Sequence, residues 1–196
     1  EIKAYSVENG NYTKAFTMQK GTSLSSSATG EIATFKVAWD SNNIYVNVIP
    51  TTKGSTGTVK IFVGDKIETA SLSDNTVVTV PLDNAIAIND VLGFDILVES
   101  NGNSVIWNDL SYKGTANPNN FGKLMITQAP KYAKAQNGTP VIDGQIDDKW
   151  STAEVINLDT FSEGSNGATA TARTLWDKDN VYVLVEVKDP LLSKAS

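Results

Sequence analysis

Carboxylates, hydroxyls and aromatic rings are the side chains that could carry chemistry here, because the 196 residues include no cysteine and no histidine. This absence excludes disulfides, thiol nucleophiles, Ser-His-Asp triads and metal sites with histidine or cysteine ligands. Two kinds of chemistry remain open: an oxygen-ligated site for a hard cation, and hydrolysis by a pair of carboxylates.

A glycosidase-like pair needs two carboxylates that face each other across a cleft, one of them with a raised pKa. The glutamates are scattered, and no recognisable motif surrounds any of these: Glu31, Glu68, Glu99, Glu154 and Glu186. The sequence therefore identifies no catalytic residue, and whether the chain belongs to an enzyme stays open at this point.

Three aspartates, Asp143, Asp147 and Asp148, lie close together in the segment DGQIDD. The segment lacks the register D-x-[DN]-x-[DN]-G with a later glutamate, so it is not an EF-hand loop. A calcium site of another kind needs about six to eight oxygens, gathered from loops far apart in the sequence. Solvated turn carboxylates are the alternative interpretation.

The tryptophans and tyrosines could either fill a core or offer flat surfaces to a ligand. Trp39 and Trp176 each end a strand-like segment and directly precede an aspartate, so we expect buried core or strand-end tryptophans followed by aspartate-capped turns. Trp107 and Tyr112 lie in a turn-rich stretch and are the candidates for a stacking platform. A structural role is the alternative for Trp107.

Acidic residues outnumber basic ones, 22 to 16, which gives a formal net charge of −6 and a pI of about 4.6. Nucleic acids and anionic membranes bind basic surfaces, and no run of lysine or arginine overrides this average. No stretch reaches the ~20 apolar residues of a membrane span. We therefore expect a soluble protein that binds neither nucleic acid nor membrane.

Short segments rich in β-branched residues recur along the chain: TFKVAW, IYVNVI, TVKIFV, TVVTV, GFDILV and NVYVLVEV. Clusters of glycine, asparagine, serine and aspartate separate them and are typical of turns. No long segment has the apolar period of a surface helix. The pattern predicts an all-β fold, an antiparallel β-sandwich of jelly-roll type.

An internal repeat indicates how the chain is organised. ATFKVAWDSNNIYVNV at 33–48 aligns without gaps with ATARTLWDKDNVYVLV at 170–185, and half of the positions are identical. A repeat this far apart indicates duplicated domains rather than a solenoid. We predict a first β-sandwich domain at 1–128, a polar linker at 129–139, and the first part of a second copy at 140–196.

The second copy resembles the opening half of a family 9 carbohydrate-binding module. The resemblance rests on VIDGQIDDKW followed by ATARTLWDKDNVYVLVEVKDPLL. The first domain resembles the same family more weakly, through AWDSNNIYVNV, VKIFVGD, GFDILVESNGNSVIWND and NPNNFGKLMI. Such modules occur on bacterial xylanases, often in tandem, and the resemblance implies a calcium-stabilised β-sandwich that binds the ends of plant polysaccharide chains.

The family holds a terminal sugar between two tryptophans, and the first domain lacks both. One position falls near Gly54 and the other at Thr115. Trp107 and Tyr112 are then the remaining carbohydrate-binding candidates of this domain. The calcium that the resemblance implies makes Asp143 and Asp189 the candidate metal ligands.

Two functions follow from this comparison. The first is a non-catalytic carbohydrate-binding module region of a secreted or cell-surface bacterial protein, whose parent is an endo-1,4-β-xylanase and whose partner is xylan or cellulose. The second is a structural spacer without sugar binding. The first domain is expected to bind polysaccharide weakly or not at all, because it lacks the aromatic pair.

The second copy is too short to bury a core of its own. Its segment NVYVLVEV would leave an apolar face and a strand edge exposed. We therefore expect residues 140–196 to dock on the first domain, to form a homodimer, or to be completed within a longer protein.

Overall fold

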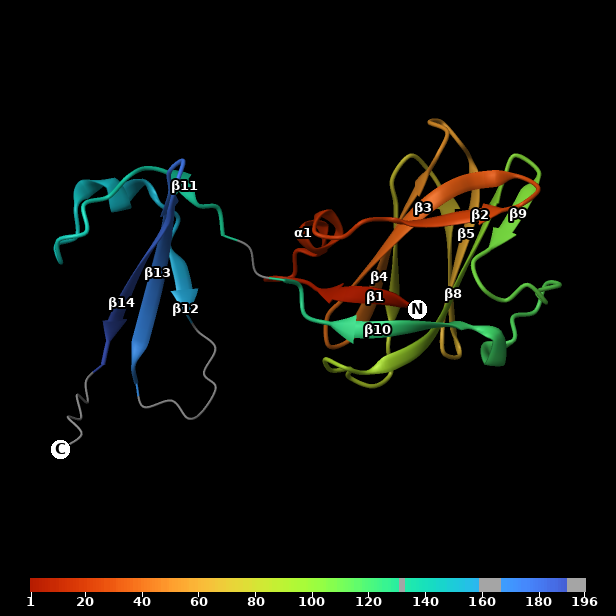
Figure 1. Cartoon of the computed structure of the whole chain (residues 1–196). Helices are drawn as coiled ribbons and strands as arrows, with labels where there is room; N and C mark the ends of the chain where they lie inside the picture. Colours follow the sequence, from red (N-terminus) through yellow and green to blue (C-terminus); the bar gives the residue numbers. More distant parts are fainter. Residues whose placement is uncertain (131–132, 159–166, 190–196) are drawn as a thin grey trace. The chain divides into compact units, whose positions relative to one another are not determined.

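The computed structural model describes residues 1–130, 133–158 and 167–189. The chain divides into two compact units, Glu1–Pro130 and Lys131–Ser196, which are considered separately (Figure 1). No helix of the described residues is both long enough and apolar enough to cross a membrane.

Strands make up nearly all of the regular structure of the first unit, with one short helix, α1 (Tyr12–Thr17), and a 3₁₀ turn at Pro118–Asn120. The strands are β1 (Ile2–Ser6), β2 (Thr22–Ser26), β3 (Gly30–Trp39), β4 (Asn43–Pro50), β5 (Gly57–Val63), β6 (Lys66–Leu72), β7 (Thr76–Pro81), β8 (Val91–Ser100), β9 (Asn103–Ile106) and β10 (Gly122–Thr127).

Hydrogen bonds connect these strands in the order β6-β5-β8-β10-β1-β3-β4-β7, with β2 added to β3 and β9 to β8. The strands at the two ends of this order, β6 and β7, follow each other in the chain, so the sheet curves back on itself. Phe35 of β3 and Phe94 of β8 accordingly meet across the core, with ring centroids 5.9 Å apart. The predicted all-β sandwich is confirmed.

One strand departs from the antiparallel pattern. β1 lies between β10 and β3 and is parallel to both, whereas the other pairs in this unit are antiparallel (Figure 1). The N-terminal strand inserts between strands that are far away in the sequence, and no hairpin constrains its direction.

Alternation along the strands builds the core, because successive side chains point to opposite faces. Ile44, Val46 and Val48 of β4 are fully buried, as are Val59 and Ile61 of β5. Burying each such side chain contributes about 1.5–3 kcal/mol. The core of the first unit lies between the two halves of the curved sheet.

An aspartate and a tyrosine close the turn between β3 and β4. Asp40 Oδ1 accepts the backbone N–H groups of Asn42 and Asn43, both at 2.8 Å, and Tyr45 donates its hydroxyl to Asp40 Oδ2 at 2.6 Å. This hydrogen bond is the main cause that raises the pKa of Tyr45 to about 12. Burial favours a higher pKa for Asp40, but its hydrogen bonds outweigh burial and lower the pKa.

The second unit is a small sheet around β13 (Thr169–Trp176). β12 (Ile156–Leu158) and β14 (Val181–Lys188) pair with it in antiparallel fashion, and β11 (Gln136–Asn137) pairs in parallel. β11 thus lies in the segment expected to be a linker. Trp150, carried by a 3₁₀ turn at Asp148–Thr152, packs with Ala153 and Leu175.

The internal repeat forms the same hairpin in both units, and the predicted turn caps are confirmed. Tyr182 donates to Asp177 Oδ2 at 2.6 Å, as Tyr45 does to Asp40. Hydrogen bonds, first that from Tyr182, lower the pKa of Asp177 to about 2.

Burial distinguishes the two hairpins. Val181, Val183 and Val185 of β14 are 72%, 61% and 51% exposed, although their repeat equivalents on β4 are fully buried. Trp39 is buried as expected, and its indole N–H donates to the carbonyl oxygen of Thr127 at 2.7 Å. Trp176 is 45% exposed, and it ends β13, so it takes the strand-end position rather than a place in the core. No described residue of the second unit covers this face of β14.

Candidate functional site

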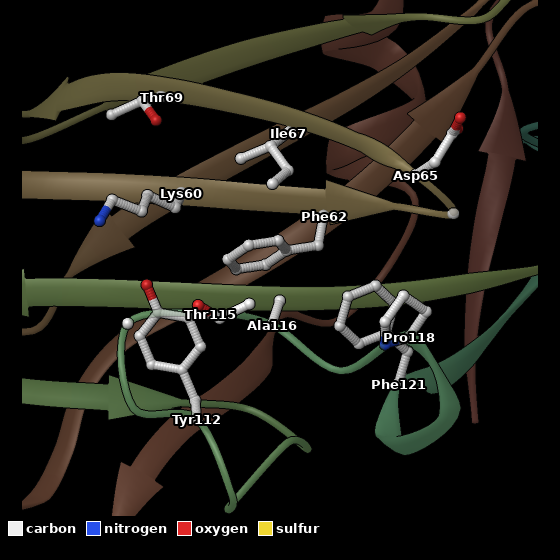
Figure 2. Close-up of a pocket in the computed structure, with 12 residues that line it drawn as sticks. Lys60, Phe62, Asp65, Ile67, Thr69, Tyr112, Thr115, Ala116, Pro118 and Phe121 are labelled. Atoms are coloured by element: carbon white, nitrogen blue, oxygen red, sulfur yellow. The ribbon is translucent and has the colours of Figure 1, made fainter.

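A pocket of about 310 Å³ opens between the β5–β6 hairpin and the segment 112–121 of the first unit (Figure 2). This volume is at the lower end of the range of small-molecule sites, about 300–1,000 Å³. The lining residues are Lys60, Phe62, Gly64, Asp65, Ile67, Thr69, Tyr112, Gly114, Thr115, Ala116, Pro118 and Phe121.

Aromatic rings form the apolar part of the pocket. Phe62 lies on the outer face of β5, opposite the core-facing Ile61 and Val63, yet it is only 2% exposed. The rings of Tyr112 and Phe121 cover it, with centroids 6.1 Å and 5.7 Å from that of Phe62. Figure 2 shows Tyr112 and Phe121 flanking Phe62 from the loop side.

The hairpin adds a mixed rim to this floor. Ile67 and Thr69 of β6 lie directly across from Phe62 and Lys60 of β5 in the strand register. Lys60 Nζ is 3.9 Å from a carboxylate oxygen of Glu99, and Asp65 lies at the turn of the hairpin. An apolar floor with hydroxyl, ammonium and carboxylate groups at its rim suits a ligand with one apolar face and several polar groups.

A buried carboxylate on β8 anchors the loop that carries Tyr112. Asp95 accepts the backbone N–H groups of Asn108 at 3.0 Å and Asp109 at 2.7 Å. Burial is the first cause that raises the pKa of Asp95, and its backbone hydrogen bonds oppose this effect.

The second buried carboxylate, Asp109, gathers the rest of the loop. It accepts the Ser111 hydroxyl at 2.5 Å, the Asn117 backbone N–H at 2.9 Å and the Asn120 amide at 3.0 Å. These hydrogen bonds, led by that of Ser111, lower the pKa of Asp109 to about 2. The network fixes both ends of the segment that covers Phe62. Sequence analysis did not single out Asp95 or Asp109.

The structure places only one of the two predicted stacking residues at the pocket. Tyr112 lines it, whereas Trp107 packs against the core, 6.0 Å from the Phe35 ring and 6.1 Å from the Phe94 ring. A Cβ atom on Gly122 would lie 2.0 Å from the Trp107 ring, so this ring fills the space above the glycine.

Two further positions come from the family resemblance. Thr115 lines the pocket, whereas Gly54 is not among the lining residues. Gly54 lies in a turn with a φ of +79°, and its N–H donates to Asp74 Oδ1 at 2.6 Å. The pocket therefore contains one of the two positions at which the resemblance implies a tryptophan. Sequence analysis missed Phe62 and Phe121, although the alternation in VKIFV places Phe62 on the face opposite Ile61.

The predicted metal ligands lie in the second unit. Asp143 is exposed, and its Oδ1 accepts the backbone N–H of Gln145 at 2.9 Å; Asp189 directly follows β14. Within residues 1–130, 133–158 and 167–189, no group of three or more acidic side chains that could hold a metal ion is found. The calcium ion therefore stays a prediction.

Comparison with protein families gives a match for the second unit. Residues 142–196 match the model described as carbohydrate family 9 binding domain-like. The family 9 segment thus includes β12, β13 and β14 together with Trp150.

Several xylanases contain a region similar to the chain as a whole or to part of it. Endo-1,4-beta-xylanase A of Thermoanaerobacterium saccharolyticum is 33% identical over 206 aligned residues, which covers 85% of this chain and 18% of that protein. Endo-1,4-beta-xylanase A of Thermotoga neapolitana is 44% identical over 105 residues, covering 53% of this chain and 10% of that protein. The chain spans less than a fifth of the length of these relatives.

A solved structure also resembles the chain. It is a family 9 carbohydrate-binding module of Caldicellulosiruptor kristjanssonii in complex with glucose, with a TM-score of 0.49 and 14% identity. The match covers 67% of this chain and 97% of that one.

Proposed function

We propose that this chain is part of the non-catalytic carbohydrate-binding module region of a secreted bacterial xylanase, with plant polysaccharide as its partner. The observation that carries the proposal is the family 9 segment at 142–196, in a chain of which 85% aligns with an endo-1,4-β-xylanase. In this role the module holds a separate catalytic domain near xylan or cellulose.

The pocket in the first unit supports a minor contribution to binding. Sugar rings bind through contacts between their C–H faces and flat aromatic surfaces. Tyr112 offers such a surface at the pocket, but Phe62 is covered and Thr115 supplies no ring. The proposal therefore assigns only weak binding to the first unit.

Affinity gel electrophoresis of the 196-residue chain tests the proposal. The chain is run in native gels with and without soluble xylan or hydroxyethylcellulose, beside an unrelated acidic protein of similar mass. We expect either polysaccharide to retard the chain and to leave the reference protein unaffected. Equal mobility in all gels would contradict the proposal.

The alternative function is a structural spacer, favoured in the first unit by the absence of an aromatic ring at Gly54 and Thr115. Isothermal titration of residues 1–130 with xylobiose and cellobiose distinguishes the two functions. This fragment buries a core of its own and forms a separate compact unit, so it is suited to measurement alone. Heat signals that saturate would exclude a pure spacer.

A structural calcium ion in the second unit is part of the same proposal, with the exposed carboxylate of Asp143 and that of Asp189, after β14, as its candidate ligands. An ion that binds only the folded state stabilises it by about 2.7 kcal/mol at a hundredfold excess over its Kd. We expect calcium to raise the thermal midpoint and a chelator to lower it. An unchanged midpoint would remove calcium from the proposal.

A further inference from the structure

The first unit has a second groove beside β3. It lies where the strand that pairs with one edge of β3 changes from β2 to β1. β2 pairs with β3 up to Phe35, and β1 pairs with it from Val37 onward. A hollow of about 340 Å³ lies at this exchange, lined by residues of β1, of β3 and of the segment that enters β2. Gln19 lies in it and donates from Nε2 to the carbonyl oxygen of Val37 at 2.5 Å.

Three lysines line this groove: Lys3, Lys20 and Lys36. Lys3 and Lys36 directly precede Ala4 and Val37, which are buried in the core. Because side chains alternate along a strand, both lysines lie on the outer face of the sheet. Lys20 reaches the same groove from the residues before β2.

Three lysines elsewhere in the unit have a carboxylate partner, and the structure shows none among the described residues for the lysines of the groove. Lys14 pairs with Glu8, Lys60 with Glu99, and Lys66 with Asp83. No ion pair within the described parts of the chain involves a lysine of the groove. Glu1 is the one acidic residue among the lining residues.

The concentration of positive charge is unusual for a chain with a net charge of −6. Like charges directly opposite each other on neighbouring strands destabilise a sheet, and a bound anion reduces their repulsion. Tyr5 adds a half-buried aromatic ring to the same groove. Ammonium groups beside a phenol ring can bind a molecule that has both a carboxylate and an apolar face.

We propose that this groove binds carboxylate-bearing sugars, the uronic acid groups of acidic plant polysaccharides. The inference rests on the proposed function, which supplies the polysaccharide. Lys3, Lys20 and Lys36 bind the carboxylate and its neighbouring hydroxyls, and Tyr5 supports the sugar ring. The groove shares no lining residue with the pocket around Tyr112.

Affinity gels with three polymers test this groove on the 196-residue chain: glucuronic acid-substituted xylan, neutral arabinoxylan and poly-L-glutamate. We expect the strongest retardation in the acidic xylan, and we expect its excess over arabinoxylan to disappear between ~20 mM and ~500 mM NaCl. The variant Lys3→Gln/Lys36→Gln is expected to lose roughly three- to thirtyfold in affinity for the acidic xylan, the effect of two exposed ion pairs.

A matched variant controls for net charge. Lys53→Gln/Lys134→Gln changes two exposed lysines outside the groove and should bind the acidic xylan as the unmodified chain does. Equal affinity for both xylans, an equal loss in the control variant, or equal retardation by poly-L-glutamate would overturn the groove proposal. Retardation by arabinoxylan would still support the proposed function in each case, whereas no retardation in any gel would contradict both.

Discussion

Asp95 Oδ2 accepts the backbone N–H of Asp109 at 2.7 Å, and both aspartates are fully buried. Asp109 in turn accepts hydrogen bonds from Ser111, Asn117 and Asn120. The position of Tyr112 at the pocket therefore depends on two carboxylates that act in series. Asp95 on β8 holds the start of the loop, and Asp109 at that start holds the rest of it.

The two carboxylates are expected to respond differently to neutralisation. Hydrogen bonds hold the pKa of Asp109 at about 2, so its charged form is favoured, whereas burial raises the pKa of Asp95. Asp109→Asn should therefore lower the thermal midpoint more than Asp95→Asn at pH 7. Circular dichroism melts of the two variants make the comparison, and the reverse order would contradict this account.

The stability that Asp109 contributes should depend on pH. Its folded pKa is below the unfolded value of about 3.9, so the contribution is complete above that pH and is lost as the pH falls toward 2. Urea unfolding at pH 7, 4 and 2.5 should show the difference between the unmodified chain and Asp109→Asn shrinking at the lowest pH. If this difference in stability stays constant with pH, the charge of Asp109 is not its cause.

Gly122 is required by the ring of Trp107, which lies 2.0 Å from where a Cβ atom would be. Gly122→Ala should destabilise the first unit by about 1–3 kcal/mol or more, because the ring cannot move without disturbing Phe35 and Phe94. Chemical denaturation measures the loss. Trp107→Leu should lower the free energy of unfolding less in the Gly122→Ala variant than in the unmodified chain. Additive losses would contradict a clash between the Trp107 ring and a Cβ atom at position 122.

An aromatic ring at position 115 should create sugar binding in the first unit. Thr115 is exposed and lines the pocket, so Thr115→Trp places a flat surface near Tyr112 without filling the core. One stacked ring contributes on the order of 0.5–1.5 kcal/mol, a gain of about two- to tenfold in affinity. Titration with cellobiose should detect the gain in residues 1–130, whereas Thr115→Ala should show none.

The exposed valines of β14 support the proposal that the chain forms a homodimer through residues 140–196. A second copy could pair with the β14 edge and cover its apolar face. Val183→Lys should therefore shift the chain toward monomer in light scattering after size exclusion. Val141→Lys, at a valine of similar exposure, should not. A chain that is monomeric at every concentration would contradict the dimer.

Local patterns predicted the strands well and the pocket poorly. Alternation in VKIFV or GFDILV depends only on neighbouring residues, so the strands and the core-facing Ile61 and Ile96 follow from the sequence. The burial of Phe62 depends on a loop about fifty residues later, and that loop depends on Asp95 and Asp109. No short-range pattern records such contacts.

The same limit explains why the sequence did not predict the pairing of β1 or the exposure of Trp176. The parallel pairing of β1 with β10 and β3 joins segments far apart in the sequence. Trp176 has the sequence surroundings of Trp39, but Thr127, which receives the indole N–H of Trp39, belongs to a strand outside the repeat. Similar local sequences therefore form the same hairpin in different environments.

The shared Asp–Tyr hydrogen bond has a consequence for the order of folding. It joins residues five positions apart and is present in both hairpins, with β4 buried in one unit and β14 exposed in the other. This hydrogen bond therefore needs no completed core. Closing its short loop costs far less conformational entropy than pairing β1 with β10. Each hairpin can close within microseconds and offer a preformed edge to strands that arrive from distant parts of the chain.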